Sequence, residues 1–171
     1  MLRTNGLTVI SVVNSAVNGA LGPPSANESR VENTDPDESG MFGSARLGIG
    51  HALQDGVAGA VLLPVDHALV SRADVASVVS ALMNGAAIAL PVFEGKRGHP
   101  IGVSREVMTE ILEARPDWTL RDVVHRDPTR IVEVPGSMGV VLSRFPLTNG
   151  GRAGKFTGKR GWRLARDPRA C

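Results

Sequence analysis

Hydrophobic positions along this chain alternate between short apolar runs and longer segments in which apolar residues recur every three or four positions. The apolar runs, each bounded by turn residues, lie at 7–13, 61–65, 86–92 and 131–134. Such runs are typical of strands, and helical spacing is found over about 41–53 and after Ser71, Ser104 and Thr119. We therefore predict an α/β domain with a doubly wound, mostly parallel sheet between layers of helices.

Two of the predicted helices carry complete start signals. Ser71 with Asp74, and Thr119 with Asp122, match the capping box, in which a hydroxyl and a carboxylate satisfy backbone N–H groups in the first turn. The helix after the second apolar run therefore has its own cap. Asp66, in the loop between that run and the helix, is left for another role.

The second apolar run is followed directly by Asp66. The run is continuous rather than alternating, which predicts a strand buried on both faces with Asp66 at its carboxyl end. Ligands of open α/β sheets bind outside these strand ends, so an acid there can hold a metal or a metal-bound phosphate. The alternative is a turn residue whose carboxylate accepts hydrogen bonds from nearby backbone N–H groups.

A loop rich in glycine and cations follows the third apolar run. Gly95 and Gly98 would let backbone N–H groups approach an anionic ligand, and Arg97 can bind phosphate through two parallel hydrogen bonds. His99 and Pro100 complete this loop, which we expect to face the same crevice as Asp66. The alternative is a solvated turn in which His99 is structural.

A third loop leads into the helix predicted from about residue 41. It contains Gly40, Met41 and Ser44, and its backbone N–H groups with the helix dipole can receive a phosphate or the edge of a nucleotide base. The alternative is an ordinary helix start capped by Ser39. The segment lacks the lysine of a Walker-type phosphate loop, and the four histidines of the chain do not have metal-ligand spacing.

Length and composition narrow the class of protein. A chain of 171 residues suffices for one domain with a sizeable core. The single cysteine, Cys171, excludes a disulfide framework and indicates a reducing compartment. The first twenty residues only loosely imitate a secretory signal, and no segment approaches the roughly 18 apolar residues of a membrane span. We expect a soluble, cytoplasmic protein.

The charge divides the chain into a domain over 1–149 and a basic Gly/Arg-rich tail over 150–171. The tail holds seven Arg and Lys residues against Asp167 alone, with too few apolar residues for a core, so we expect it to be disordered. The alternative is a nucleic-acid contact in which Phe156 and Trp162 stack on bases. Nothing else in the sequence favours nucleic-acid binding.

Five stretches of the chain, in this order, resemble the nucleotidyltransferase family that includes the molybdenum cofactor cytidylyltransferases and guanylyltransferases. They are 33–48 (NTDPDESGMFGSARLG), 62–71 (LLPVDHALVS), 91–104 (PVFEGKRGHPIGVS), 120–127 (LRDVVHRD) and 131–135 (IVEVP). The resemblance implies a Rossmann-like three-layer fold of the nucleotide-diphospho-sugar transferase type. It also implies transfer of a nucleoside monophosphate from CTP or GTP to a phosphorylated acceptor such as molybdopterin, with Mg²⁺ and pyrophosphate release.

The resemblance also assigns roles to individual residues. Asp66 corresponds to the metal-binding and catalytic aspartate of the family, and Arg97 is the second catalytic candidate. The acceptor-side loop is matched by Gly95, Arg97, Gly98, His99 and Pro100. This loop is closer to the cytidylyl branch, so CMP transfer is expected ahead of GMP transfer. The nucleotide side is matched by Gly40, Met41 and Ser44.

The chain departs from the family pattern at both ends. The first strand and the glycine-rich triphosphate loop of the family have no match, so we expect the sheet to be incomplete at its N-terminal side. At the other end, Ser143, Arg144 and Phe145 stand where the family has an Asp-x-Asp pair. The alternatives are therefore a working transferase, or a non-catalytic remnant that binds nucleotide at most. A second copy or a partner protein would complete the sheet.

Overall fold

Two β-sheets, rather than one, form the framework of the fold. The computed structural model describes residues 7–142, so the basic tail and Ser143, Arg144 and Phe145 lie outside it. The smaller sheet pairs β1 (Val9–Asn14) with β2 (Glu28–Asn33). The larger sheet has the order β3 (Gly59–Leu62), β6 (Ile101–Ser104), β4 (Ile88–Phe93) and β5 (Lys96–Arg97), and β7 (Ile131–Pro135) also pairs with β4.

The strands are mixed in direction, so the prediction of a mostly parallel sheet is wrong. The pairs β1–β2 and β4–β7 are parallel, whereas β3–β6, β4–β6 and β4–β5 are antiparallel. The cause is the segment after β4. Glu94 and Gly95 have positive φ angles of 49° and 73° and join β4 to β5 in a tight two-residue turn, which permits only antiparallel pairing. The strand β6, which the sequence interpretation missed, then returns between β3 and β4.

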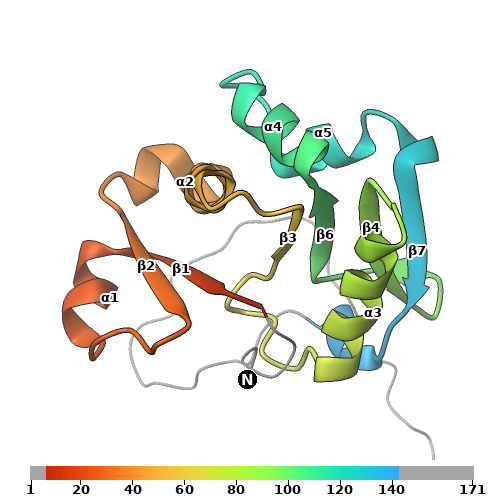
Figure 1. The fold of residues 1–171 in the computed structure, drawn as a ribbon, viewed down its shortest axis with the longest axis horizontal. Helices are drawn as coiled ribbons and strands as arrows, with labels where there is room; N and C mark the ends of the chain where they lie inside the picture. The colour runs from red at the N-terminus through yellow and green to blue at the C-terminus, as the bar shows by residue number, and fades with distance from the viewer. Residues whose placement is uncertain (1–6, 143–171) are drawn as a thin grey trace, which may run out of the picture.

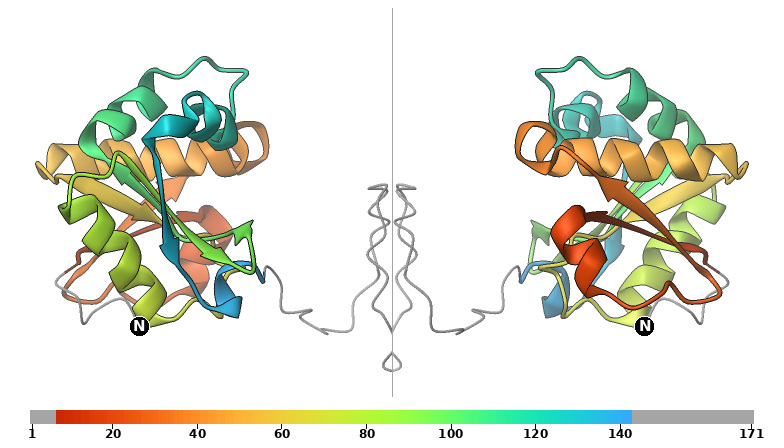
Figure 2. Two further views of the ribbon diagram at one scale, coloured as in Figure 1. Left: turned by 90° about the vertical axis from the view of Figure 1, so that its right-hand side faces the viewer. Right: turned by 90° about the vertical axis from the view of Figure 1, so that its left-hand side faces the viewer.

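Helices cover both faces of the larger sheet (Figure 2). On one face lie α2 (Pro36–Gln54), α4 (Arg105–Glu113) and α5 (Leu120–His125), and on the other lies α3 (Arg72–Met83). The short helix α1 (Ser15–Ala20) follows β1, and the 3₁₀ turns η2 (Pro128–Arg130) and η3 (Met138–Val140) flank β7. Both predicted capping boxes are present, at Ser71 and at Thr119.

The main core lies between the larger sheet and the helices α2, α4 and α5. Its buried members are Ile49, Ala52, Ile88, Leu90, Val103, Val107, Met108, Ile111, Val123 and Val124. The strand β4 is the most enclosed, since its first four residues are all buried. On the opposite face, Val75 and Val78 of α3 are buried, and Gly102 of β6 leaves room for Val78 because a Cβ there would lie 2.6 Å from its Cγ1.

The framework is interrupted between β1 and β3. The smaller sheet lies next to the β3 end of the larger one, and α2 packs against strands of both (Figure 1). Within residues 7–142, β1 pairs only with β2 and β3 only with β6. No residue of β3 is fully buried, and Val65 beyond it is 97% exposed, so the expectation of a strand buried on both faces is wrong. The apolar run at 61–65 extends past the end of β3 at Leu62, and within residues 7–142 β3 is an edge strand that pairs on one side only.

Candidate functional site

Asp66 lies in a tight turn after β3 rather than at the strand's last residue. The strand ends at Leu62, and the backbone N–H of His67 donates to the Pro64 carbonyl at 3.1 Å, closing a turn with Asp66 near its tip. A second turn follows, in which Val70 donates to the His67 carbonyl at 3.2 Å. Both turns lie ahead of the Ser71 cap. The sequence thus places Asp66 on a short loop fixed by its own backbone hydrogen bonds.

The carboxylate of Asp66 is exposed and has no hydrogen bond or ion pair to another residue in the range 7–142. It therefore does not cap a helix or close a turn through its side chain. The cap of α3 comes from Ser71, which accepts from the Asp74 N–H at 3.2 Å. A carboxylate held on a fixed loop and left to solvent fits a role as a ligand for a cation.

The Asp66 loop and the loop over 95–100 are brought together by two histidines. The rings of His67 and His99 lie with their centroids 4.3 Å apart at an interplanar angle of 54°. His67 is buried, with 8% of its surface exposed, although both of its sequence neighbours are exposed. The sequence interpretation placed both loops at one crevice, and this ring contact shows that they meet.

Burial lowers the pKa of His99 below its ordinary value, and the neighbouring His67 ring lowers this pKa further. The negative charge of Asp66 and a hydrogen bond to the Leu62 backbone act in the opposite direction on the same pKa. The net effect favours the neutral imidazole. The influence of Asp66 also places its carboxylate within electrostatic reach of His99.

A third segment, residues 136–141, closes the site from the side of β7. The His99 N–H donates to the Val140 carbonyl at 2.8 Å. The approach is so close that a Cβ at Gly98 would overlap the same carbonyl oxygen, and a Cβ at Gly139 would overlap that of Leu69. Only glycine fits at either position. Gly98 is thus required by packing, and Pro100 beside it is fully buried.

Arg97 is directed toward β7 rather than toward Asp66. Its Nε donates to Oε1 of Glu133 at 2.7 Å, with 39% and 50% of the two side chains exposed. Gly95, in contrast, has the positive φ that the β4–β5 turn requires. Arg97 therefore forms a surface ion pair that an anionic ligand would have to replace or share.

The nucleotide-side candidates lie at a break in α2. Gly40 has φ 56° and ψ −161°, so the helix is interrupted there and resumes at Met41, which is 74% exposed. The Ser44 hydroxyl donates to the Gly40 carbonyl at 3.3 Å and accepts from the Asn33 amide at 3.0 Å.

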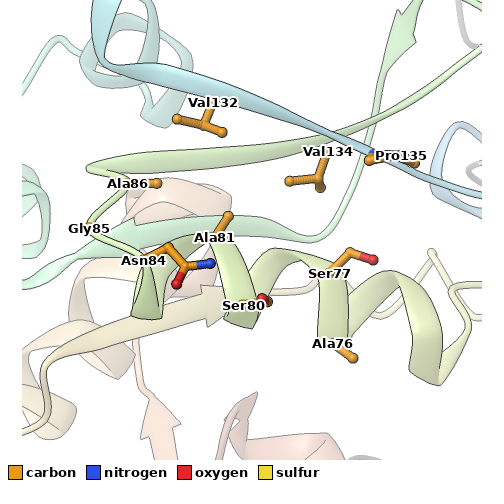
Figure 3. A pocket seen from close by; sticks show the side chains of 10 residues that line it. All are labelled: Ala76, Ser77, Ser80, Ala81, Asn84, Gly85, Ala86, Val132, Val134 and Pro135. Atoms are coloured by element: carbon orange, nitrogen blue, oxygen red, sulfur yellow. The ribbon is translucent and has the colours of Figure 1, made fainter.

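An open surface groove lies elsewhere. It has a volume of about 720 Å³ and lies between α3 and β7 (Figure 3). The side chains along it are mostly small: Ala76, Ser77, Ser80, Ala81, Asn84, Gly85, Ala86, Val132, Val134 and Pro135. None of the site residues predicted from the sequence lines it. The groove is open and poor in charge, so it carries no part of the chemistry considered below.

The side chains fit a metal that is held partly by its substrate. Among the side chains of residues 7–35 and 40–142, no group of three or more His, Cys, Asp or Glu is placed to hold an ion. Mg²⁺ is commonly held by one or two carboxylates together with substrate phosphates, and the exposed Asp66 satisfies that minimum.

Sequence reasoning missed His67, Val140 and Glu133. His67 follows Asp66 in the sequence, and the second histidine of the pair was already a candidate, so only the spatial contact was lacking. The roles of Val140 and Glu133 depend on β7 lying parallel beside β4, which local sequence patterns do not reveal.

The alternating strands and helices define an α/β protein with mixed sheets, and comparison with known proteins gives the family. Residues 4–131 match the MobA-like NTP transferase domain, so the chain belongs to this family. A comparison with curated proteins found no match. No helix within residues 7–142 combines the length and apolar character needed to cross a membrane.

Three solved structures have similar folds. Rv0371c from Mycobacterium tuberculosis H37Rv shares 23% identity at a TM-score of 0.59, covering 79% of this chain and 69% of the other. Its manganese complex shares 23% identity at a TM-score of 0.56, covering 75% and 67%. A homologue from Mycobacterium sp. strain JC1 shares 20% identity at 0.54, covering 74% and 64%. At these identities the likeness shows the fold alone.

Proposed function

We propose that this chain transfers a nucleoside monophosphate, CMP ahead of GMP, from an NTP to a phosphorylated acceptor such as molybdopterin, with release of pyrophosphate. Membership of the MobA-like NTP transferase family gives the reaction class. The observation that carries the proposal is the contact between His67 and His99, because it joins the loop of the free carboxylate Asp66 to the acceptor-side loop.

The roles follow from the demands of phosphoryl transfer, which needs positioning and neutralisation of charge more than covalent catalysis. Asp66 would hold Mg²⁺, which supplies charge neutralisation at the phosphate oxygens. Arg97 is assigned to the acceptor side, where its guanidinium can bind an acceptor phosphate once the ion pair with Glu133 is broken. The break at Gly40, with Met41 and Ser44, leaves a helix start on the nucleotide side.

Calorimetry with CTP and with GTP, each in the presence and absence of Mg²⁺, tests this proposal on the intact chain. Metal-dependent binding of CTP that is lost in Asp66→Asn supports it. Asp55→Asn is the matched control, since Asp55 is an exposed aspartate at the end of α2. Pyrophosphate release with molybdopterin as acceptor then tests turnover. Equal CTP affinity in the wild type and Asp66→Asn removes the metal assignment.

A second candidate is a module of the same family that binds nucleotide without turning it over. The interruption between β1 and β3 favours it, because a site built on an open framework is less well positioned. In that case CTP binds with Mg²⁺ but no pyrophosphate appears under single-turnover conditions. Turnover that appears only when a second copy or a partner protein completes the sheet would connect the two candidates.

A further inference from the structure

The contact between His67 and His99 leaves two buried nitrogen atoms without partners. Within residues 7–142, neither the Nδ1 atom of His67 nor that of His99 has a hydrogen-bond partner, and both atoms are inaccessible to solvent. His67 is more than nine-tenths buried. Buried polar atoms are nearly always paired, because leaving one unpaired costs free energy. Two such atoms on adjacent rings point to a missing common partner.

The arrangement of the rings suits two imidazoles on one ion. Two imidazoles bound at the tetrahedral angle, at metal–nitrogen distances of about 2.1 Å, have ring centroids roughly 5 Å apart. The centroids of His67 and His99 lie 4.3 Å apart, and the rings are tilted by 54° rather than stacked.

The surroundings of His99 are those of a ligating histidine. The Leu62 backbone is close enough to the His99 ring to raise its pKa, and Nδ1 of this ring has no partner. Histidines that bind metals commonly donate their second N–H to a backbone carbonyl, which fixes the tautomer and leaves a lone pair on the ligating nitrogen. The negative charge of Asp66 acts on the same ring and would stabilise a cation there.

We propose that His67 and His99 form a two-nitrogen site for a transition-metal ion such as Zn²⁺ or Co²⁺. Imidazole nitrogen selects these ions over Mg²⁺, which prefers oxygen ligands. No third His, Cys, Asp or Glu ligand is in place among the side chains that the structure describes, so non-protein ligands would have to fill the remaining positions of the ion. The proposal goes beyond nucleotidyl transfer and does not depend on it, because Mg²⁺ was assigned to Asp66 and the nucleotide to the segment with Gly40, Met41 and Ser44.

The first experiment titrates Co²⁺ into the full-length chain without a histidine tag. Cys171→Ser serves as the background, so that the thiol does not compete for the metal. We expect one saturable site by visible absorption and calorimetry, with affinity reduced on the order of tenfold or more in His67→Gln and in His99→Gln. His125→Gln is the matched control, since His125 is exposed on α5, and it should bind as the background does. Unchanged affinity in both His67→Gln and His99→Gln overturns the proposal.

The second experiment uses unsubstituted histidines, so it does not depend on the folding of a variant. Long-range ¹H–¹⁵N spectra of the Cys171→Ser chain, recorded with and without Zn²⁺, report on each imidazole nitrogen separately. We expect the Nδ1 resonances of His67 and His99 to shift, and those of His51 and His125 to stay in place. Shifts confined to His51 or His125, or to none of the four, overturn the proposal. Asp66→Asn should retain Co²⁺ binding to within a few-fold, which separates this site from the Mg²⁺ site.

Discussion

The carboxylate of Asp74, in the first turn of α3, accepts hydrogen bonds from the backbone N–H of Ser137 at 2.7 Å and from its hydroxyl at 2.8 Å. The same carboxylate accepts from the N–H and the hydroxyl of Ser71, and only 3% of Asp74 is exposed. Asp74 thus caps its own helix and ties it to the segment that follows β7. Because that segment continues to Val140, the link also supports the backbone beside His99.

Replacing Asp74 by alanine should lower the free energy of unfolding by about 3 kcal/mol. The change removes a helix cap and takes the charged acceptor away from the N–H and hydroxyl of Ser137. Urea denaturation followed by circular dichroism measures the effect. Asp122→Ala is the matched control, because Asp122 forms the same capping box with Thr119 but is exposed and has no such long-range bond. Equal losses in the two variants would show that the Ser137 link adds nothing.

The contribution of Asp74 should also depend on pH. Burial alone would raise the pKa of Asp74, but the hydrogen bonds from Ser71 and Ser137 outweigh it and hold the pKa below its ordinary value. A lowered folded-state pKa means that the stabilisation is fully present above the unfolded value, near pH 4, and is lost as the pH falls through the folded value.

Urea midpoints of the wild type and Asp74→Asn, measured from pH 7 to pH 2.5, test this dependence. The difference between the two proteins should be constant above about pH 5 and shrink below about pH 4. The contributions of all carboxylates other than Asp74 are the same in both proteins, so they cancel in the difference between the urea midpoints. A gap that widens as the pH falls contradicts the assignment.

The elements of the fold could be predicted wherever the signal was local. The capping boxes at Ser71 and Thr119 gave the starts of α3 and α5, and apolar runs gave β1, β4 and β7 to within about two residues. The direction of the strands could not be predicted. The strand direction depends on the tight turn at Glu94 and Gly95, and the same sequence is equally typical of a ligand-binding loop.

The candidate site shows the same division. Asp66 and the 95–100 loop were proposed from composition and position, and the ring contact brings the two loops together, while their common crevice stays a prediction. The contacts of Gly98 and Arg97 were not predicted, because each residue contacts a partner far along the chain. Gly98 packs against the Val140 carbonyl, and Arg97 forms an ion pair with Glu133. A pattern of glycine and arginine therefore located the loop without giving the function of each residue.

Gly98→Ala should destabilise the protein by about 3 kcal/mol, since the added methyl group overlaps the Val140 carbonyl oxygen and the backbone must shift. Thermal unfolding provides the measurement. Gly19→Ala is the matched control, because a Cβ at Gly19 meets nothing within 4 Å and the residue lies in α1. That control should be neutral or slightly stabilising. A Gly98→Ala protein as stable as the Gly19→Ala protein would argue against the packing of the three loops.

Glu133→Gln should strengthen the binding of pyrophosphate without weakening the fold. The ion pair with Arg97 is half exposed, and such pairs contribute roughly 0–1 kcal/mol to stability. Releasing Arg97 makes its guanidinium available to an anion, so we expect a few-fold higher affinity by calorimetry. The double variant Glu133→Gln with Arg97→Gln should lose the gain. An increase that persists in the double variant would mean that general charge, and not Arg97, is responsible.

Backbone amides in β1 and β3 should exchange with solvent faster than those in β4. Within residues 7–142, β1 and β3 each pair on one side only, and all residues of β3 are partly exposed. In contrast, β4 pairs with both β6 and β7 and starts with four buried residues. Local opening needs less free energy where fewer buried contacts and ladder hydrogen bonds are broken. Hydrogen exchange measured by mass spectrometry on peptides over 9–14, 59–62 and 88–93 gives the comparison.

Repeating the exchange measurement at tenfold higher protein concentration tests whether a second copy covers the open edges, since protection of β1 and β3 would then rise while that of β4 stays constant. Protection in β1 and β3 equal to that of β4 at every concentration would contradict an open framework.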